Sequence, residues 1–547
     1  MSMSMLVPDF PFSYDTYLAH PAGLGSLPAD AHGTPVAIIG GGLAGVICAH
    51  ELLKLGARPV VYESAALGGR MRTARFPDSP APPADLGAMR FPRSSRALFH
   101  YIDQAGLRTA PFPNPLAPAT PSTVIELGGE RHYARTAADL PPLFHEVSRC
   151  WEQCLRAANG DALRAAIAQR DHHAIKDLWN PMVARLDDES FYGFLARAPG
   201  FAEQPFRYRE MFGQVGFGTG GWDTDFPNSI LEVLRVVLTG ADEDHHRIVA
   251  GADALPRAIW RLPLGESAHW PAGTSVATVH PGGPRMGARR IHRDARGEIA
   301  VTDMLGNTAS YAAVIVTCQT WLLSARIDCD EGLFHHDLWS AMERSHYMQS
   351  SKTFVTVDRP FWRDIHPGTG QHAMSMTLTD RLTRATSLLE DQPNGPATIC
   401  LSYTWNDDAL KWLALDPAER VRLMLHSLRM IYPDVDIAAH IRGEPITVSW
   451  ESDPNFMGAF KNNLPGHYRY QQRLFTHFMQ DSIAPQHRGI YLAGDDISFT
   501  AGWAEGAVTT ALNAVWAVQR QLGGRACSGN PGPGDVFDEL APLVLGS

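Results

Sequence analysis

Residues 36–64, VAIIGGGLAGVICAHELLKLGARPVVYES, contain the pattern that decides the fold. An apolar run leads into three glycines, and an amphipathic helical pattern follows from about Leu43 to Leu55. Gly56 then ends the helical pattern, and a second apolar run closes on Glu63. Strand, glycine turn, helix and strand in this order predict one complete βαβ unit.

The glycines of this unit have the GxGxxG spacing of a dinucleotide-binding turn. Gly40 allows the tight turn, Gly42 lets the backbone approach a pyrophosphate, and Gly45 permits close packing of the helix on the strand. The N-terminus of the helix attracts the anion. Glu63 ends the next strand, where its carboxylate would accept the ribose hydroxyls. We expect a bound dinucleotide; an ordinary glycine-rich turn is the alternative.

Two further segments suggest that the same ligand is long and buried. LGGRMRT (67–73) places Gly69 beside Arg70 directly after the βαβ unit, which offers backbone donors and a cation to the pyrophosphate. A surface turn with solvated arginines is the alternative for this motif. YLAGDD (491–496) precedes FTAGWAEGAVTTALNAV (499–515), a glycine-rich turn and helix start that could present donors to a flavin.

Composition excludes several classes of protein. The chain has 547 residues, of which 45% are hydrophobic and 19% charged, so we expect a globular protein of three or four compact units or two large ones. The net charge of −11 disfavours nucleic acid as a partner. We find no signal peptide and no apolar run long enough for a membrane span, and expect a cytoplasmic location. The seven scattered cysteines favour reduced thiols.

The remaining sequence alternates between helical and strand patterns. Residues 1–32 lack helical periodicity and predict an irregular arm on the surface. Helical periodicity dominates from about Leu140 to Thr239 and predicts a mostly helical insertion. Short β-rich runs then return, beginning with SVATVH (275–280).

Several of these segments together resemble the flavin amine oxidase superfamily. The motifs are IIGGGLAG (38–45), LGGRMRT, DLGAMRFP (85–92) and GWAEGAVTTALNAVWAV (502–518). Within the superfamily the chain is similar to the bacterial L-amino-acid 2-monooxygenases and oxidases. The closer resemblance is to the lysine 2-monooxygenases, through FGQVGFGTGGWDTDFPNSILEVLRVV (212–237) and YMQSSKTFVTVDRPFW (347–362).

The resemblance implies an α/β fold with noncovalent FAD in a Rossmann-like domain, an interleaved mixed-sheet substrate domain and a mostly helical insertion. The implied divisions are an N-terminal arm (1–32), three FAD-binding parts (33–110, 250–330, 485–525), a helical insertion (111–249), a substrate domain (331–484) and a tail (526–547). The implied FAD-binding residues are Gly40, Gly42, Leu43, Ala44, Gly45, Glu63, Ser64, Gly69, Arg70, Met89, Arg90, Val276, Gly494, Asp495, Trp503 and Ala504.

Oxidation of an α-amino acid requires a carboxylate anchor, a neutral amine and a dry pocket beside the flavin. Arg90 matches the family arginine that binds the substrate carboxylate, and a guanidinium suits this two-oxygen partner. A structural pairing of Arg90 with Asp85 is the alternative. Tyr403 resembles the tyrosine that assists the same carboxylate. Lys352 matches the lysine that holds a water near the flavin and helps the reduced flavin react with oxygen.

Large aromatic side chains would exclude water from this pocket. The resemblance places Trp503 beside the flavin and Phe460 in another pocket segment, with Trp450 as a weaker candidate. Ordinary core packing is the alternative for each of these side chains.

The substrate class depends on Asp225. In the lysine-type relatives this aspartate pairs with the distal ammonium, so lysine is the first choice, and arginine or ornithine satisfies the same charge. Asp225 could instead cap the helix that begins near Asn228. Ala241 departs from the family, because lysine monooxygenases often carry cysteine there. This position bears on whether the imino acid is kept and decarboxylated or released.

We therefore expect an FAD enzyme that oxidises a basic L-amino acid with O2, as a 2-monooxygenase that forms an amide. The alternative functions are an L-amino acid oxidase, a flavin-binding protein without turnover and a nicotinamide-dependent dehydrogenase. We expect no metal site, since DEDHH (242–246) is typical of an exposed acidic loop. A homo-oligomer, dimer or tetramer, is expected as the assembly.

Overall fold

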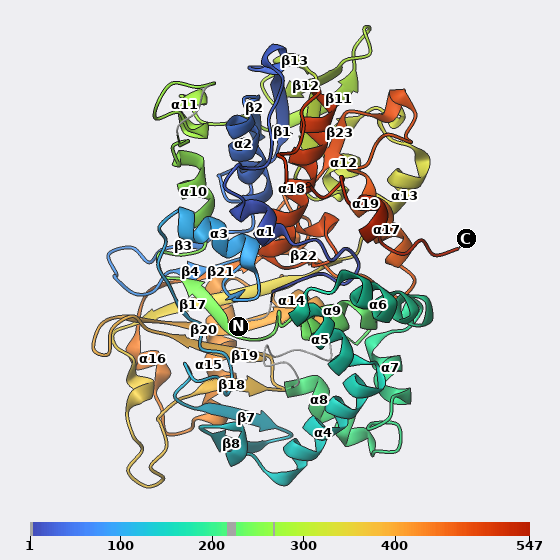
Figure 1. The fold of residues 1–547 in the computed structure, drawn as a ribbon. Helices are drawn as coiled ribbons and strands as arrows, with labels where there is room; N and C mark the ends of the chain where they lie inside the picture. Colours follow the sequence, from blue (N-terminus) through green and yellow to red (C-terminus); the bar gives the residue numbers. More distant parts are fainter. Residues whose placement is uncertain (1–3, 216–225, 266–268, 547) are drawn as a thin grey trace.

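The computed structural model describes residues 4–215, 226–265 and 269–546 (Figure 1). In the view of Figure 1 a parallel sheet and its helices fill the upper half, and a larger mixed sheet with helices α4–α9 fills the lower half. Over the described ranges, no helix combines the length and apolar character needed to cross a membrane.

A five-stranded parallel sheet has the order β10-β2-β1-β14-β23. Its strands come from distant parts of the sequence: β1 (Pro35–Ile39), β2 (Arg58–Glu63), β10 (Arg285–Met286), β14 (Ala313–Val316) and β23 (Ile490–Leu492). The predicted βαβ unit is confirmed, because β1 and β2 pair in parallel and helix α2 spans Leu43–Leu55 between them. Gly56 ends α2 with a φ of 99°, a conformation that favours glycine.

Helix α2 is enclosed by the protein. Every residue of α2 except Lys54 is buried, since α18 (Ala504–Gln521) and α10 (Ala254–Arg261) pack on it. A helix that is apolar almost all round belongs to the interior of a large domain. The turn that precedes α2 is therefore held rigidly against the sheet.

A four-stranded sheet lies beside the parallel one. Its strands, in the order β13-β12-β11-β15, are β11 (Ala288–Arg293), β12 (Ile299–Asp303), β13 (Thr308–Tyr311) and β15 (Asp328–Cys329). The β-rich prediction for residues 275–280 is wrong: Val276–Val279 form the short helix α11. Ser275 and Thr278 make a reciprocal capping box, and these hydrogen bonds outweigh the strand preference of the two valines.

The lower half is built on a seven-stranded mixed sheet of order β21-β17-β20-β19-β18-β7-β8. Its strands are β7 (Thr123–Leu127), β8 (Glu130–Ala134), β17 (Ser350–Val357), β18 (Met376–Thr379), β19 (Ala385–Leu389), β20 (Ala397–Trp405) and β21 (Ile441–Ser449). Strands β17 and β20 pair with Lys352 opposite Tyr403, so these two predicted site residues are cross-strand neighbours.

The mostly helical insertion that the periodicity between residues 140 and 239 predicts is confirmed, and its helices lie beside this sheet in the lower half of Figure 1. They are α4 (Pro142–Ala157), α5 (Gly160–Gln169), α6 (His172–Leu186), α7 (Phe191–Arg197), α8 (Phe206–Val215) and α9 (Ile230–Leu238). The other helices are α1 (Tyr14–Ala19), α3 (Arg96–Gln104), α12 (Trp321–Ala325), α13 (His336–Glu343), α14 (Asn406–Leu410), α15 (Pro417–Ile431), α16 (Ile437–His440), α17 (Tyr468–Thr476) and α19 (Phe537–Leu540).

Small sheets connect the two halves. Strands β3 (Thr73–Ala74) and β4 (Ala84–Asp85) pair with each other, as do β16 (Tyr347–Met348) and β22 (Phe460–Lys461). A three-stranded sheet has β9 (His245–Ile248) between β5 (Phe91–Pro92) and β6 (Thr109–Pro111).

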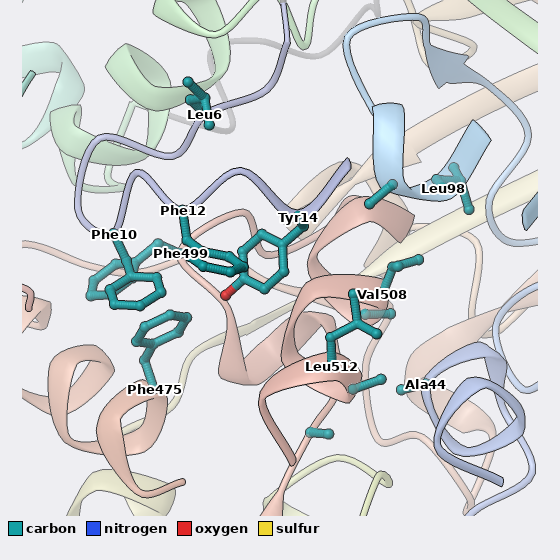
Figure 2. Packing of buried hydrophobic residues seen from close by; sticks show 14 of the residues in the cluster. Leu6, Phe10, Phe12, Tyr14, Ala44, Leu98, Phe475, Phe499, Val508 and Leu512 are labelled. Atoms are coloured by element: carbon teal, nitrogen blue, oxygen red, sulfur yellow. The ribbon is translucent and has the colours of Figure 1, made fainter. Parts of the chain in front are cut away.

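The N-terminal segment is largely irregular, as predicted, but the prediction that it lies on the surface is wrong. Phe10 and Phe12 are buried, and the ring of Phe10 packs against that of Phe475 of α17, with centres 5.4 Å apart (Figure 2). Tyr14 begins helix α1 and donates a hydrogen bond of 2.7 Å to Asn513 of α18. Long-range aromatic packing, which local periodicity does not reveal, makes this segment part of the core.

Candidate active site

One cavity of about 560 Å³ is lined both by the glycine turn after β1 and by residues of β17 and β20 in the seven-stranded sheet. A cavity of this size is in the usual range for cofactor and small-molecule sites. Most of the predicted site residues line it: Gly40, Gly42, Leu43, Ala44, Glu63, Ser64, Gly69, Arg70, Met89, Arg90, Lys352, Tyr403, Trp450, Phe460, Gly494, Asp495, Trp503 and Ala504.

The glycine-rich end of the cavity is formed by two turns in direct contact. Gly68 donates its N–H to the carbonyl of Gly41 at 2.9 Å, and a Cβ on Gly42 would lie 3.9 Å from Cα of Gly69. The space beside the Cα of Gly42 is therefore open on the side of the cavity. Gly45 has the structural role, since its Cβ would lie only 2.0 Å from the carbonyl oxygen of Gly40.

Glu63 and Arg70 place opposite charges along this end. The Glu63 carboxylate accepts hydrogen bonds from Gly41 N–H at 2.6 Å and Ala65 N–H at 2.7 Å, which orients it at the end of β2. Arg70 forms a bidentate ion pair with Asp495, with one N–O distance of 3.1 Å. The three segments predicted to converge on one ligand thus meet here.

Arg90 holds a half-buried positive charge that faces the cavity. It donates one hydrogen bond, of 3.0 Å, to Oδ1 of Asn114, and no described carboxylate forms an ion pair with it. Burial lowers the pKa of Arg90 from its ordinary value, yet a guanidinium stays charged in proteins. Asp85, the alternative partner, accepts instead from Thr73 at 2.6 Å and from Ala252 N–H at 2.9 Å. Such an uncompensated cation favours an anionic ligand.

Lys352 lies in the middle of β17 and is 2% exposed. Its Nζ donates to the carbonyls of Asp85 at 3.1 Å and Gly87 at 2.5 Å, and it lies 4.6 Å from the centre of the Tyr403 ring. Burial lowers the pKa of Lys352 to about 8. The amine is thus fixed at the cavity wall and titrates near neutral pH.

Aromatic rings line the wall between these charges. The Tyr403 and Trp405 ring centres are 5.4 Å apart, and Trp405 lies 5.4 Å from Phe460. Trp450 donates its indole N–H to the carbonyl of Leu86 at 3.1 Å. Trp405 was missed by sequence reasoning, although its position two residues after Tyr403 on a strand places both on one face.

Besides Gly45, which packs against the backbone of Gly40, three predicted site residues lie elsewhere or outside the described part. Val276 is buried in α11 and does not line the described cavity; Gly287 and Ala288 line it instead. The buried Ala241 does not line it either, but its neighbour Asp242 does. Asp225 lies outside the described residues.

Two described carboxylates line the cavity beyond Arg90. Glu232 is neutralised by Arg235 at 2.7 Å and accepts from Asn463 at 2.9 Å. Oδ1 of Asp242 is buried without a hydrogen-bond partner among the described residues, and burial raises its pKa to about 7. The cavity lining therefore includes both a cation without an ion-pair partner and a carboxyl oxygen without a hydrogen-bond partner among the described residues.

Comparison with known proteins identifies the family. A sequence profile described as flavin containing amine oxidoreductase matches residues 43–519, which is most of the chain. This chain belongs to the flavin-containing amine oxidase family.

Two relatives in this family are tryptophan 2-monooxygenases. One, from Rhizobium radiobacter, is 32% identical over 542 residues, with 93% of this chain and 68% of the relative covered. The other, from Pseudomonas savastanoi, is 32% identical over 565 residues, with 96% of both chains covered. The solved structure of cyclohexylamine oxidase from Brevibacterium oxydans has a TM-score of 0.65 at 17% identity, covers 90% of this chain and 99% of its own, and supports the fold.

FAD is the cofactor of this family member, and the residues present fit it. The open space above Gly42 lets the pyrophosphate approach the backbone, and the N-terminus of α2 faces the same point. The Glu63 carboxylate at the end of β2 suits the ribose hydroxyls. Trp503 and Ala504 begin α18 at the cavity, where backbone donors can meet the flavin ring.

Proposed function

We propose that this FAD enzyme oxidises a basic L-amino acid, with L-lysine first, at the α carbon. As a 2-monooxygenase it converts L-lysine and O2 into 5-aminopentanamide, CO2 and water. The observation that carries the proposal is Arg90, a half-buried cation without an ion-pair partner among the described residues, in the same cavity as the FAD-binding turns.

Arg90 binds the substrate carboxylate and thereby sets the position of the α carbon. The planar guanidinium holds a carboxylate through parallel hydrogen bonds, and the Tyr403 side chain at the same wall offers a hydroxyl to it. FAD, when bound, accepts two electrons from the substrate and passes them to O2. Aromatic side chains exclude water, which strengthens the ionic contacts made inside.

Lys352 acts on the oxygen half of the reaction. Its ammonium is fixed by the carbonyls of Asp85 and Gly87, so it presents a positive charge without reorganisation. That charge stabilises anionic oxygen species near the cavity. Since its pKa is lowered to about 8, the charge is present at neutral pH and is lost in alkaline solution.

A basic side chain is favoured by the acids of the cavity. Asp242 has a buried oxygen in need of a donor, and the ammonium of lysine is such a donor. Asp225 stays a predicted partner of the same ammonium. The relatives compared above are named for tryptophan, an uncharged side chain that would leave Asp242 unsatisfied.

An L-amino acid oxidase acting on lysine or arginine is the second candidate. It shares the oxidation of the α carbon but releases the imino acid, so that water gives the 2-oxo acid and ammonia while O2 becomes hydrogen peroxide. Ala241, in place of the cysteine common in lysine monooxygenases, favours release of the imino acid over its decarboxylation. The Ala241 methyl does not face the described cavity, so its effect would pass through its neighbours.

One aerobic incubation tests both candidates. The purified FAD-loaded protein is mixed with L-lysine, 5-aminopentanamide is measured by mass spectrometry, and peroxide is measured in parallel. The proposal expects amide in excess of peroxide. Peroxide with 2-oxo acid alone would establish the oxidase, and turnover of L-tryptophan without turnover of L-lysine or L-arginine would refute the basic substrate.

A further inference from the structure

A three-stranded sheet brings together three side chains that are far apart in the sequence. Arg90 directly precedes β5, Asn114 follows β6, and His245 begins β9, the strand between them. The backbone N–H of Phe112 donates to the carbonyl of His245 at 2.7 Å. The backbone around Asn114 is also held, because its carbonyl accepts from Ala117 N–H at 3.2 Å.

These side chains form one continuous hydrogen-bond chain. Arg90 donates to Oδ1 of Asn114 at 3.0 Å, and Nδ2 of Asn114 donates to Nδ1 of His245 at 2.6 Å. Nε2 of His245 then donates to the carbonyl of Ala241 at 2.8 Å. His245 also lines the cavity, with its ring centre 5.6 Å from that of Trp503.

The chemistry of Arg90 fixes the direction of the whole chain. A guanidinium only donates, so Asn114 must present its oxygen to Arg90 and its amide N–H to His245. Nδ1 of His245 must then be an acceptor, and its proton must be on Nε2, where the Ala241 carbonyl receives it. Protonation of both ring nitrogens would break the chain at Asn114.

We propose that Asn114 and His245 are positioning residues that hold the Arg90 guanidinium in the orientation needed for the substrate carboxylate. This inference rests on the proposed function, in which Arg90 is the carboxylate anchor. Asn114 occupies one donor of Arg90 and leaves the others for the ligand. Through the same hydrogen bonds, the orientation of Arg90 depends on the Ala241 carbonyl and on the His245 ring, which packs against Trp503.

The test compares two lysine fragments, of which one keeps the carboxylate that Arg90 would bind and the other keeps the α-amine in its place. In anaerobic calorimetry with FAD-loaded protein, 6-aminohexanoate has the carboxylate and distal ammonium of lysine, whereas 1,5-diaminopentane has both amines without the carboxylate. We expect Asn114→Ala and His245→Phe to weaken 6-aminohexanoate about 10-fold, as the loss of one buried hydrogen bond implies. Binding of 1,5-diaminopentane should change less than about twofold, within the scatter of such measurements.

Two further variants separate positioning from folding. His246 is the neighbour of His245 on β9, has its side chain on the other face near Phe99, and does not line the described cavity, so His246→Phe is the matched control and should bind both ligands normally. Asn114→Asp keeps the shape and an acceptor for Arg90 but adds a negative charge and removes the donor to His245. It should weaken 6-aminohexanoate more than Asn114→Ala does.

Equal weakening of both ligands, or unchanged binding of 6-aminohexanoate, would overturn the positioning role. If the wild-type protein does not bind 6-aminohexanoate and is not reduced by L-lysine, the proposed substrate is wrong. The positioning role is then tested with 3-(indol-3-yl)propanoate and tryptamine, the corresponding pair for tryptophan, and the same two outcomes decide it.

Discussion

Gly42 and Gly45 stand three residues apart in one turn, and the structure predicts opposite consequences when each is changed to alanine. A Cβ on Gly45 would lie 2.0 Å from the carbonyl oxygen of Gly40 and 3.0 Å from Oγ1 of Thr317. The first of these atoms belongs to the backbone, so helix α2 must move away from β1. Overpacking of this kind costs about 3 kcal/mol, which for a chain of this length lowers Tm by roughly 3 °C.

A Cβ on Gly42 meets no protein atom closer than 3.9 Å, and its φ of −72° suits any residue. Gly42→Ala should therefore leave the Tm of the FAD-free protein unchanged within about 1 °C, as expected for an unstrained substitution. Its methyl group instead occupies the approach of the pyrophosphate. Loss of one charge-assisted hydrogen bond, about 1.5–3 kcal/mol, weakens FAD binding by roughly 10- to 100-fold.

The assay measures thermal unfolding of both FAD-free variants and then the dissociation constant of FAD by flavin fluorescence. The expected pattern is a lower Tm for Gly45→Ala, and a normal Tm with weak FAD binding for Gly42→Ala. Normal FAD affinity in Gly42→Ala would refute the assignment of this turn to the pyrophosphate.

Three further predictions concern the substrate end of the cavity. Arg90→Lys removes the forked donor and should lower kcat/KM about 10- to 100-fold for every amino acid substrate; a loss confined to one substrate would contradict the anchor role. Asp242→Asn should raise KM for L-lysine about 10-fold but leave KM for L-norleucine nearly unchanged, since only lysine has a distal cation; an equal rise for both would remove Asp242 from substrate recognition. Lys352 has a pKa lowered to about 8, so reoxidation of the reduced flavin by O2 should be fast below that pH and slow down above it. In the Lys352→Met variant, stopped-flow reoxidation of the flavin should be about 100-fold slower than in the wild type at every pH. If the rate of this variant still changed with pH, the pH dependence would belong to another group.

The sequence predicts best the parts of the fold that local interactions decide. The glycines at 40, 42 and 45 and the buried helix after them combine turn chemistry with periodicity, and the structure has the helix at the predicted bounds. The prediction of a strand at residues 275–280 is wrong although local interactions decide this segment too. Two valines in alternation resemble a strand, while Ser275 and Thr278 cap a helix.

Long-range contacts explain what the sequence could not show. Phe10 and Phe12 look like parts of an irregular arm until the burial of both rings and the contact of Phe10 with Phe475 of α17 are known. Asn114 and His245 are separated by 131 positions, and only the pairing of β6 with β9 brings them together. Their neighbours Arg90 and Trp503 were predicted from the family resemblance. A resemblance identifies residues within the matching motifs, but not the side chains outside them that hold those residues in place.

The most direct test of the account is anaerobic mixing of the FAD-loaded protein with L-lysine while the absorbance of oxidised flavin is followed. We expect that L-lysine removes the yellow colour, that D-lysine does not, and that Arg90→Ala retains the colour at the same lysine concentration. A flavin that stays oxidised with L-lysine and other basic L-amino acids, or an Arg90→Ala variant reduced as readily as the wild type, would contradict it.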